Sequence, residues 1–529
     1  MFKLLKLLTR RYPEDARVYA LREALGVAPE SGAARPLARV AVQCVEDPFY
    51  FGLFALIAKE LRRSAFIESE LVMVRSVNAA VGFNWRTAIM RSPLVSAVLN
   101  VQWKRAFAGL VDRIAYCSQS LRHPIADLVD WWNSVRLWLG ARDEAALFGL
   151  AIQGVPVGDL IADTYLRFRP SPRFKRADLF TIRLIWQAHR DVRLARRYFG
   201  GRKPTLYLTS NCCYLQHGIP VRVALQEGVW VYAFGNEQEF GKLLTKADSF
   251  HAASCDRYKE IFETLDHQAE RLAQAEKELE ERLNGGQDAA FRYLPTRAYA
   301  ALEAEAPREI KGGVVIFLHD FYDSPHYLPG LFFRDFWEWA CVTIEELLRA
   351  GVRCYVKPHP DQIDLSDDAV RQLRKAFPEI SFLSSTIANS KLAQAGMICG
   401  VTAYGKVAHE LAYLGIPTIC CAKHPHHAFQ FSRTATTLDQ YKEFLHTPSV
   451  LPIDRSEMQR QALAFYYMHN LYGTADQLAL REASNEFMKA CERPDCSEDE
   501  LARLLRALPG LPAFTAFMER LRSHCMTSS

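Results

Sequence analysis

The 529-residue sequence lacks several features that define whole classes of protein. No stretch approaches the roughly 18 apolar residues that propose a membrane-spanning helix. Glycine (27) and proline (25) occur in ordinary numbers, which excludes collagen-like and low-complexity chains. With 9 Trp, 31 Phe and 21 Tyr, the chain can bury more than one core, so disorder is not its main state. The length suggests two to four domains.

The 13 cysteines form no Cys-x-x-Cys pair, and we recognise no Cys/His cluster with zinc-like spacing. Two pairs, Cys212-Cys213 and Cys420-Cys421, are vicinal, which is a poor geometry for disulfides. The first residues lack the apolar segment and small-residue cleavage site of a secretory signal. We therefore expect a cytoplasmic protein with reduced, mostly buried thiols, no metal site and no cofactor.

The net charge of +5 conceals an uneven distribution. Residues 1–206 contain 32 Lys and Arg against 18 Asp and Glu, whereas the remainder contains 33 against 42. A basic half indicates an anionic partner, and a solvated basic surface is the alternative. Residues 1–11 carry Leu on one side and Lys/Arg on the other, so they either lie on the inner membrane leaflet or pack as a first helix. The basic residues are dispersed and no recognition motif is present, so we predict no nucleic-acid binding.

Short apolar segments alternate with helical ones in two successive series, which is typical of open parallel sheets. The predicted strands are residues 37–45, 71–77, 205–209 and 229–233 in the first series, and 313–318, 352–357, 380–383, 396–400 and 416–421 in the second. We predict an α/β protein with two Rossmann-type doubly wound domains facing a central cleft, and extra helices at both ends. The predicted divisions are an acceptor-side domain at 1–305, a donor-nucleotide domain at 306–450, and helices at 451–529 that pack back on the domains.

Polar residues follow three strands of the second series, where parallel sheets bind their ligands. A helix beginning near Gly405 would offer N–H groups to a diphosphate, with Lys406 adding a cation. Glu410 could accept hydrogen bonds from ribose hydroxyls. The alternative is purely structural: Lys357-Pro358-His359-Pro360 would be a rigid turn at a strand end, and Gly405 would form a tight turn. The predicted donor-binding residues are His319, Lys357, His359, Thr402, Gly405, Lys406, His409 and Glu410.

The first series contains two carboxylates at i,i+4 spacing, Asp159 and Asp163, which would share one face of a helix. Neighbouring carboxylates raise each other's pKa, which suits one of them to act as a general base. The alternative is that one caps a helix while the other pairs with Arg167. His217 is a further catalytic candidate, and Glu46 and Asp47 are others.

A second polar group follows the strand predicted at 229–233 and could line the acceptor side of the site. It comprises Glu237, Gln238, Glu239 and Lys242.

Five segments carry a resemblance to a known family. Lys357-Pro358-His359-Pro360, followed by residues 405–417, resembles bacterial capsule and lipopolysaccharide glycosyltransferases of GT-B architecture, a set that includes the Kdo transferases of capsule assembly. His424-Pro425-His426-His427 is also similar to that set, as are residues 154–165 and 217–220. The resemblance spans about residues 150–445.

The resemblance implies a nucleotide-sugar donor bound by the C-terminal domain, an acceptor bound by the N-terminal domain, and no metal in the chemical step. The sequence agrees in lacking an Asp-x-Asp motif at a strand end. It differs in carrying Lys406 and Ala408 where the family often has a hydroxyl residue and glycine, so the donor's sugar and base stay open.

The function predicted is sugar transfer from a nucleotide-linked donor to a growing bacterial surface glycan, in capsule or O-antigen. The alternatives are a polyol-phosphate transferase with a CDP-linked donor, a nucleotide-sugar epimerase, and a non-catalytic scaffold subunit of a glycan assembly complex. The partners expected are an activated sugar donor and an anionic or lipid-linked acceptor.

Overall fold

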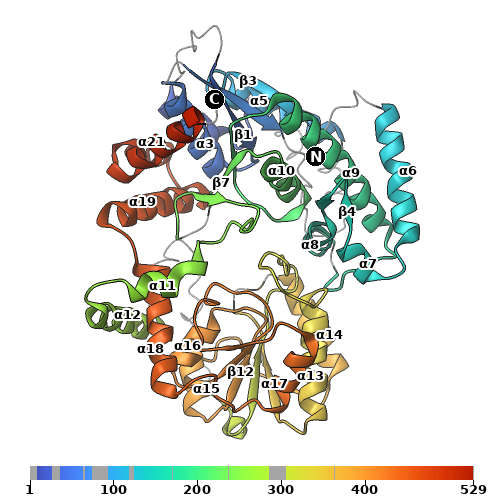
Figure 1. Cartoon of the computed structure of the whole chain (residues 1–529), viewed down its shortest axis with the longest axis vertical. Coiled ribbons are helices and arrows are strands. Elements are labelled where there is room, and N and C mark those ends of the chain that lie inside the picture. The colour runs from blue at the N-terminus through green and yellow to red at the C-terminus, as the bar shows by residue number, and fades with distance from the viewer. Residues whose placement is uncertain are drawn as a thin grey trace. The chain divides into compact units, whose positions relative to one another are not determined.

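A computed structural model describes residues 9–26, 36–63, 66–73, 93–117, 124–169, 171–235, 238–284, 305–360, 362 and 364–527 (Figure 1). The chain forms two compact units, which we treat separately. Unit 1 comprises Met1–Arg169, Lys175–His251 and Gly473–Ser529, and unit 2 comprises Pro170–Phe174 and Ala252–Tyr472. Within the ranges described, no helix is both long and apolar enough to cross a membrane.

Unit 1 is built on a six-stranded sheet of order β3-β2-β1-β6-β7-β8, which is parallel except for the last strand. The chain starts in the middle, adds strands to one side, and then adds the rest to the other, as in a doubly wound fold. The strands are β1 (Ala38–Cys44), β2 (Ile67–Met73), β3 (Arg113–Cys117), β6 (Leu206–Thr209), β7 (Trp230–Ala233) and β8 (Lys242–Leu244), and a separate hairpin contains β4 (Ala151–Ile152) and β5 (Val155–Pro156).

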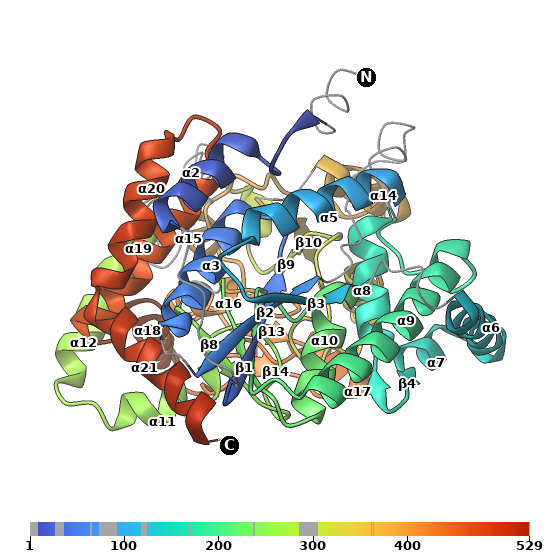
Figure 2. The ribbon, with the colours of Figure 1, turned by 90° about the horizontal axis from the view of Figure 1, so that it is seen from above.

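Helices cover both faces of this sheet. Val40 and Val42 of β1 face a core shared with α3 and the C-terminal helices, whereas Tyr207 of β6 contacts Phe199 of α9 with ring centroids 5.2 Å apart. Figure 2 shows α19, α20 and α21 beside α2 and α3. The helices are α2 (Asp15–Leu25), α3 (Pro48–Arg62), α5 (Pro93–Phe107), α6 (Pro124–Gly140), α7 (Glu144–Phe148), α8 (Gly158–Phe168), α9 (Leu179–Arg202), α10 (Tyr214–Gln226), α19 (Ala475–Glu492), α20 (Glu498–Ala507) and α21 (Pro512–Thr527).

Unit 2 repeats the arrangement with a fully parallel sheet of order β11-β10-β9-β12-β13-β14. Its central strand β9 is apolar on both faces, as expected for a strand in a sheet that helices cover on both sides. Val314 and Ile316 belong to one core, and Val315 and Phe317 to the other. The strands are β9 (Val314–Phe317), β10 (Cys354–Lys357), β11 (Ser381–Phe382), β12 (Cys399–Val401), β13 (Thr418–Cys420) and β14 (Arg433–Thr434).

The core that contains Val314 is shared with α13, α14 and α17, and the opposite core is shared with α15 and α16. In Figure 1 these two groups lie on either side of β12. The helices of unit 2 are α11 (Tyr258–Glu263), α12 (Gln268–Leu283), α13 (Phe336–Arg349), α14 (Asp364–Ala376), α15 (Asn389–Gln394), α16 (Val407–Tyr413), α17 (Leu438–His446) and α18 (Arg455–Tyr466). The prediction of an α/β protein with two doubly wound sheets is confirmed.

The unit boundaries differ from the predicted ones. Residues 252–284 belong to unit 2, whereas the N-terminal domain was expected to extend to residue 305. The reason is that Phe262 of α11 and Leu279 of α12 pack in one core with Phe465 of α18. The segment predicted at 451–529 is also divided, because its part beyond Tyr472 returns to unit 1. Of the interfacial segment predicted at 1–11, residues 1–8 lie outside the described residues.

Candidate functional site

In unit 2 the strand order reverses between β9 and β12, and polar side chains join the ends of these two strands. Nε2 of His319, just after β9, lies 3.0 Å from Oγ1 of Thr402, which follows β12. Thr402 Oγ1 accepts a hydrogen bond from the N–H of Gly405 at 3.1 Å, so its own proton is available to His319. Nε2 of His319 also faces the N–H of Tyr404 at 3.5 Å, so we assign it as an acceptor and place the proton of the neutral ring on Nδ1. Burial, aided by the charge of His359, lowers the pKa of His319 to about 3.

The loop after Thr402 is closed tightly on that side chain. A Cβ at Gly405 would lie 2.6 Å from Thr402 Oγ1, so this position requires glycine. The predicted helix begins next to it, with Lys406 at the N-cap of the seven-residue α16. The N–H of Gly405 is used within the loop. An anion bound at this loop would therefore be held mainly by cationic side chains and less by backbone N–H groups at the start of α16.

Lys357, the last residue of β10, is a buried cation at the same edge of the sheet. Lys357 is 5% exposed. No described carboxylate lies within 4.0 Å of its Nζ, the distance that defines an ion pair. Its Nζ lies 5.8 Å from the ring centre of Phe317. Burial lowers the pKa of Lys357 to about 8, against the opposing charge of Glu410. An anion at this strand end would offset the cost of burying the ammonium group.

Glu410 joins three helices in the interior of unit 2. It is 1% exposed; its Oε1 lies 2.8 Å from Nη2 of Arg282, and its Oε2 accepts from Nδ2 of Asn389 at 2.7 Å. The expected contact with ribose hydroxyls would have to share these oxygens. His409, the preceding residue, is equally buried, and neither of its ring nitrogens has a hydrogen-bond partner within the described structure.

Unit 1 carries a second polar group at its own reversal point, between β1 and β6. Oε1 of Gln43 accepts from the N–H of Ser210 and from the hydroxyl of Thr209, each at 3.0 Å. These donors orient the amide so that its Nε2 donates to Nδ1 of His217 at 2.9 Å. Burial, followed by the charge of His251, lowers the pKa of His217 to about 4. His217 is therefore neutral near pH 7, with its proton on Nε2, and it presents a donor rather than a base.

The Gln43–His217 contact predicts a large pKa change in a conservative variant. Gln43→Glu should raise the pKa of His217 by about 1–3 units, because a carboxylate at that distance favours the imidazolium form. Proton NMR titration of the histidine resonances measures this shift. Gln43→Met is the control, in which the pKa should stay low. An unchanged pKa in Gln43→Glu would contradict the contact.

The two predicted carboxylates of unit 1 both lie on α8, in different surroundings. Asp159 forms a two-pronged ion pair with Arg222 of α10, including an Nη1–Oδ1 distance of 2.7 Å, and its side chain is 31% exposed. Asp163 is 2% exposed. Both oxygens of Asp159 are engaged by the guanidinium of Arg222. A substrate hydroxyl would have to compete with Arg222 for its oxygens.

The acceptor-side candidates are divided by the structure. Lys242 lies in β8 and is buried; its Nζ is 2.7 Å from Asp248 and donates to the carbonyl of Phe250, so it fastens the strand to the following loop. Glu239 is partly exposed. Glu237 lies outside the described residues. Asp47, a further base candidate, caps α3 by accepting from the N–H of Tyr50.

Several residues of these networks were missed by sequence reasoning. Gln43 and Ser210 could have been predicted in the same way as Thr402, because each is a polar residue at the carboxyl end of a buried strand. Arg222, Arg282 and Asn389 carry no such signal, because each meets its partner only through tertiary packing. The helix that holds His217 begins at Tyr214, and Pro220 lies inside it.

No family model and no curated protein matches the chain. Among solved structures, similarity extends to a provisionally assigned UDP-N-acetylglucosamine 2-epimerase from Listeria monocytogenes (10% identity, 85% of this chain and 96% of that one, TM-score 0.25). It also extends to a UDP-GlcNAc 2-epimerase from Neisseria meningitidis bound to UDP-GlcNAc (7%, 80% and 96%, 0.21) and a UGT transferase from Siraitia grosvenorii in complex with UDP (11%, 89% and 99%, 0.21).

Proposed function

We propose that the chain is a GT-B-type glycosyltransferase that moves a sugar from a nucleotide-linked donor to a growing bacterial surface glycan, in capsule or O-antigen. The observation that carries the proposal is Lys357, a buried cation at the carboxyl end of β10, next to the strand ends that His319 and Thr402 join. In doubly wound sheets this reversal point is where nucleotides bind. The resemblance of residues 357–360 and 405–417 to capsule and lipopolysaccharide transferases supports the same conclusion.

In this proposal Lys357 binds the donor diphosphate and stabilises the charge that develops as the nucleotide leaves. His359 and Lys406, both partly exposed, extend the cationic surface of the same edge. The hydrogen-bonded pair of Thr402 and His319 fixes the loop that carries Lys406. Glu410 positions α16 rather than contacting the sugar nucleotide directly.

The acceptor is proposed to bind unit 1 and to be anionic or lipid-linked, which the excess of Lys and Arg in residues 1–206 supports. The Nε2–H of His217 is suited to hold an acceptor oxygen. Asp159 and Asp163 stay the proposed sources of a general base. Of the two, Asp159 has the more accessible carboxylate, and release from Arg222 would be part of its activation.

Two kinds of observation separate this proposal from its alternatives. Thermal unfolding with UDP, CMP, CDP, GDP and CMP-Kdo should give one selective stabilisation, about 2.7 kcal/mol at a concentration of about 100 Kd. Radiolabelled donor should then yield acceptor-dependent glycan. An epimerase would convert the donor sugar without acceptor, and a polyol-phosphate transferase would transfer label from a CDP-polyol. If none of these nucleotides stabilises the protein, the proposed donor site is refuted and the scaffold role is favoured.

A further inference from the structure

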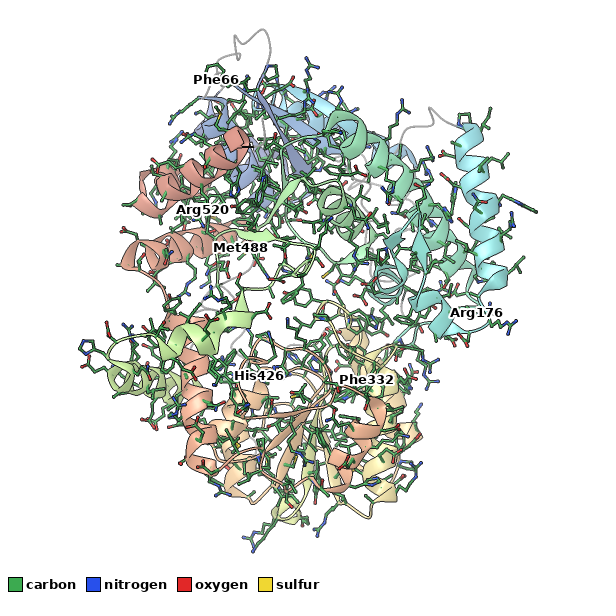
Figure 3. All side chains as sticks on the ribbon, in the orientation of Figure 1. Phe66, Arg176, Phe332, His426, Met488 and Arg520 are labelled. Atoms are coloured by element: carbon green, nitrogen blue, oxygen red, sulfur yellow. The ribbon has the colours of Figure 1, made fainter. Side chains whose placement is uncertain are left out.

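A buried group of one cysteine and two histidines lies at the end of β13, next to Gly405 and His409 of the predicted donor-binding residues. Cys420 is the last residue of the strand, and His424 and His426 follow in the next loop; Figure 3 marks the place of His426. The thiol sulfur and one nitrogen of each ring all lie within 4.8 Å of one another. All three side chains are at most 1% exposed. The two imidazole rings are stacked, with centroids 3.3 Å apart.

The ring nitrogens of this group have few hydrogen bonds to satisfy them. Nε2 of His424 lies 2.8 Å from Oγ1 of Thr434, while its Nδ1 has no partner in the described part of the chain. Neither ring nitrogen of His426 makes a well-formed hydrogen bond to the described residues, although the ring interacts with the backbone of Gly405. Buried nitrogens in natural proteins are rarely left in this state, because the desolvation cost is not recovered. When Nε2–H of His424 donates to Thr434, its Nδ1 carries the lone pair that a metal ion needs, and metal-binding histidines usually have their second ring nitrogen held in this way.

The electrostatic environment keeps both rings neutral. Burial, followed by the neighbouring imidazoles, lowers the pKa of His424 and of His426 well below the usual range. Burial raises the pKa of the Cys420 thiol. A bound metal cation would lower the pKa of the Cys420 thiol instead, because a coordinated thiol loses its proton.

We propose that Cys420, His424 and His426 bind one divalent transition-metal ion, and that Zn²⁺ suits them best. One sulfur and two imidazole nitrogens match the ligand preference of zinc, and hard cations such as Mg²⁺ would prefer oxygen. As the metal–sulfur bond forms, the thiol proton passes to solvent. Three protein ligands leave a fourth position open. The spacing of these residues is Cys-x3-His-x-His, and the proposal replaces the prediction of no metal site made from the sequence.

Cobalt titration of the full chain, after dialysis against a chelator, tests the proposal. One equivalent of Co²⁺ should produce a thiolate-to-metal charge-transfer band together with visible bands of tetrahedral intensity, and Zn²⁺ should displace both. Cys420→Ser should remove the charge-transfer band. Cys421→Ser, which alters an equally buried neighbouring thiol, should leave the band intact and is the matched control for folding.

Two further variants keep the test decisive. Thr434→Val should weaken Co²⁺ binding by about 10–100-fold without removing a ligand, because it frees the ring of His424. The described residues contain one other group of this kind, Cys212, Cys213 and His251. A band that persists in Cys420→Ser and disappears in Cys212→Ser would overturn the proposal, as would the absence of any band in the folded chain.

Discussion

Lys357→Met is expected to raise the free energy of unfolding by about 3 kcal/mol at pH 7 and to abolish selective nucleotide binding. The gain in stability follows from the position of Lys357, which is 5% exposed and has a pKa of about 8 in place of 10.5. Methionine has a similar volume and no charge, so the cost of burying the ammonium group disappears. A residue kept at such a cost is one that function requires.

The pH dependence of this effect has a definite sign. Between pH 8 and 10.5 the unfolded chain binds the proton of Lys357 more tightly than the folded chain does. The stability of the wild-type protein should therefore rise with pH through this window, relative to that of Lys357→Met. The advantage of the variant should be complete below about pH 8 and absent above about pH 10.5. Urea unfolding at pH 7 and pH 10.5 measures both ends.

Lys375→Met on the exposed face of α14 is the matched control, and it should change neither stability nor nucleotide binding appreciably. If Lys357→Met destabilises the protein and leaves nucleotide binding unchanged, the lysine is a structural residue and the proposed donor site is wrong. If it stabilises the protein and leaves nucleotide binding unchanged, the burial argument is right and the ligand assignment is wrong.

The fold could be predicted because buried parallel strands leave a direct trace in the sequence. Val314 to Phe317 is apolar at every position, since its alternating side chains enter two different cores. The strand ends followed from the same pattern, so His319 and Thr402 could be expected at one edge, and the structure brings them within 3.0 Å.

The partners of the charged residues could not be predicted in the same way. Arg282 and Glu410 are separated by 128 positions, and Asp159 and Arg222 by 63. Periodicity records which face of an element is apolar, whereas these contacts depend on how helices pack against each other. Sequence reasoning predicted Asp159 as a general base and Glu410 as an acceptor for ribose hydroxyls, and it had no access to the arginines that pair with them.

Glu410→Ala is expected to lower the free energy of unfolding by about 3–5 kcal/mol, which makes it the most damaging single substitution that we predict. The variant would leave Arg282 buried without its carboxylate, and Asn389 without its acceptor. Leaving one member of a buried ion pair uncompensated costs far more than the pair itself contributes. The double variant Glu410→Leu/Arg282→Met should recover much of the loss, because both members of the ion pair are then replaced by apolar side chains.

An exposed pair in the same unit provides the comparison. Arg371 and Asp368 lie on α14 with side chains 64% and 55% exposed, so Asp368→Ala should change stability by less than about 1 kcal/mol. Urea unfolding of the three variants completes the measurement. A loss below about 1 kcal/mol in Glu410→Ala would show that the carboxylate is not held as a buried ion pair. If nucleotide stabilisation also disappeared in that still-stable variant, Glu410 would contact the donor itself, and the positioning role argued for it would be replaced by direct recognition.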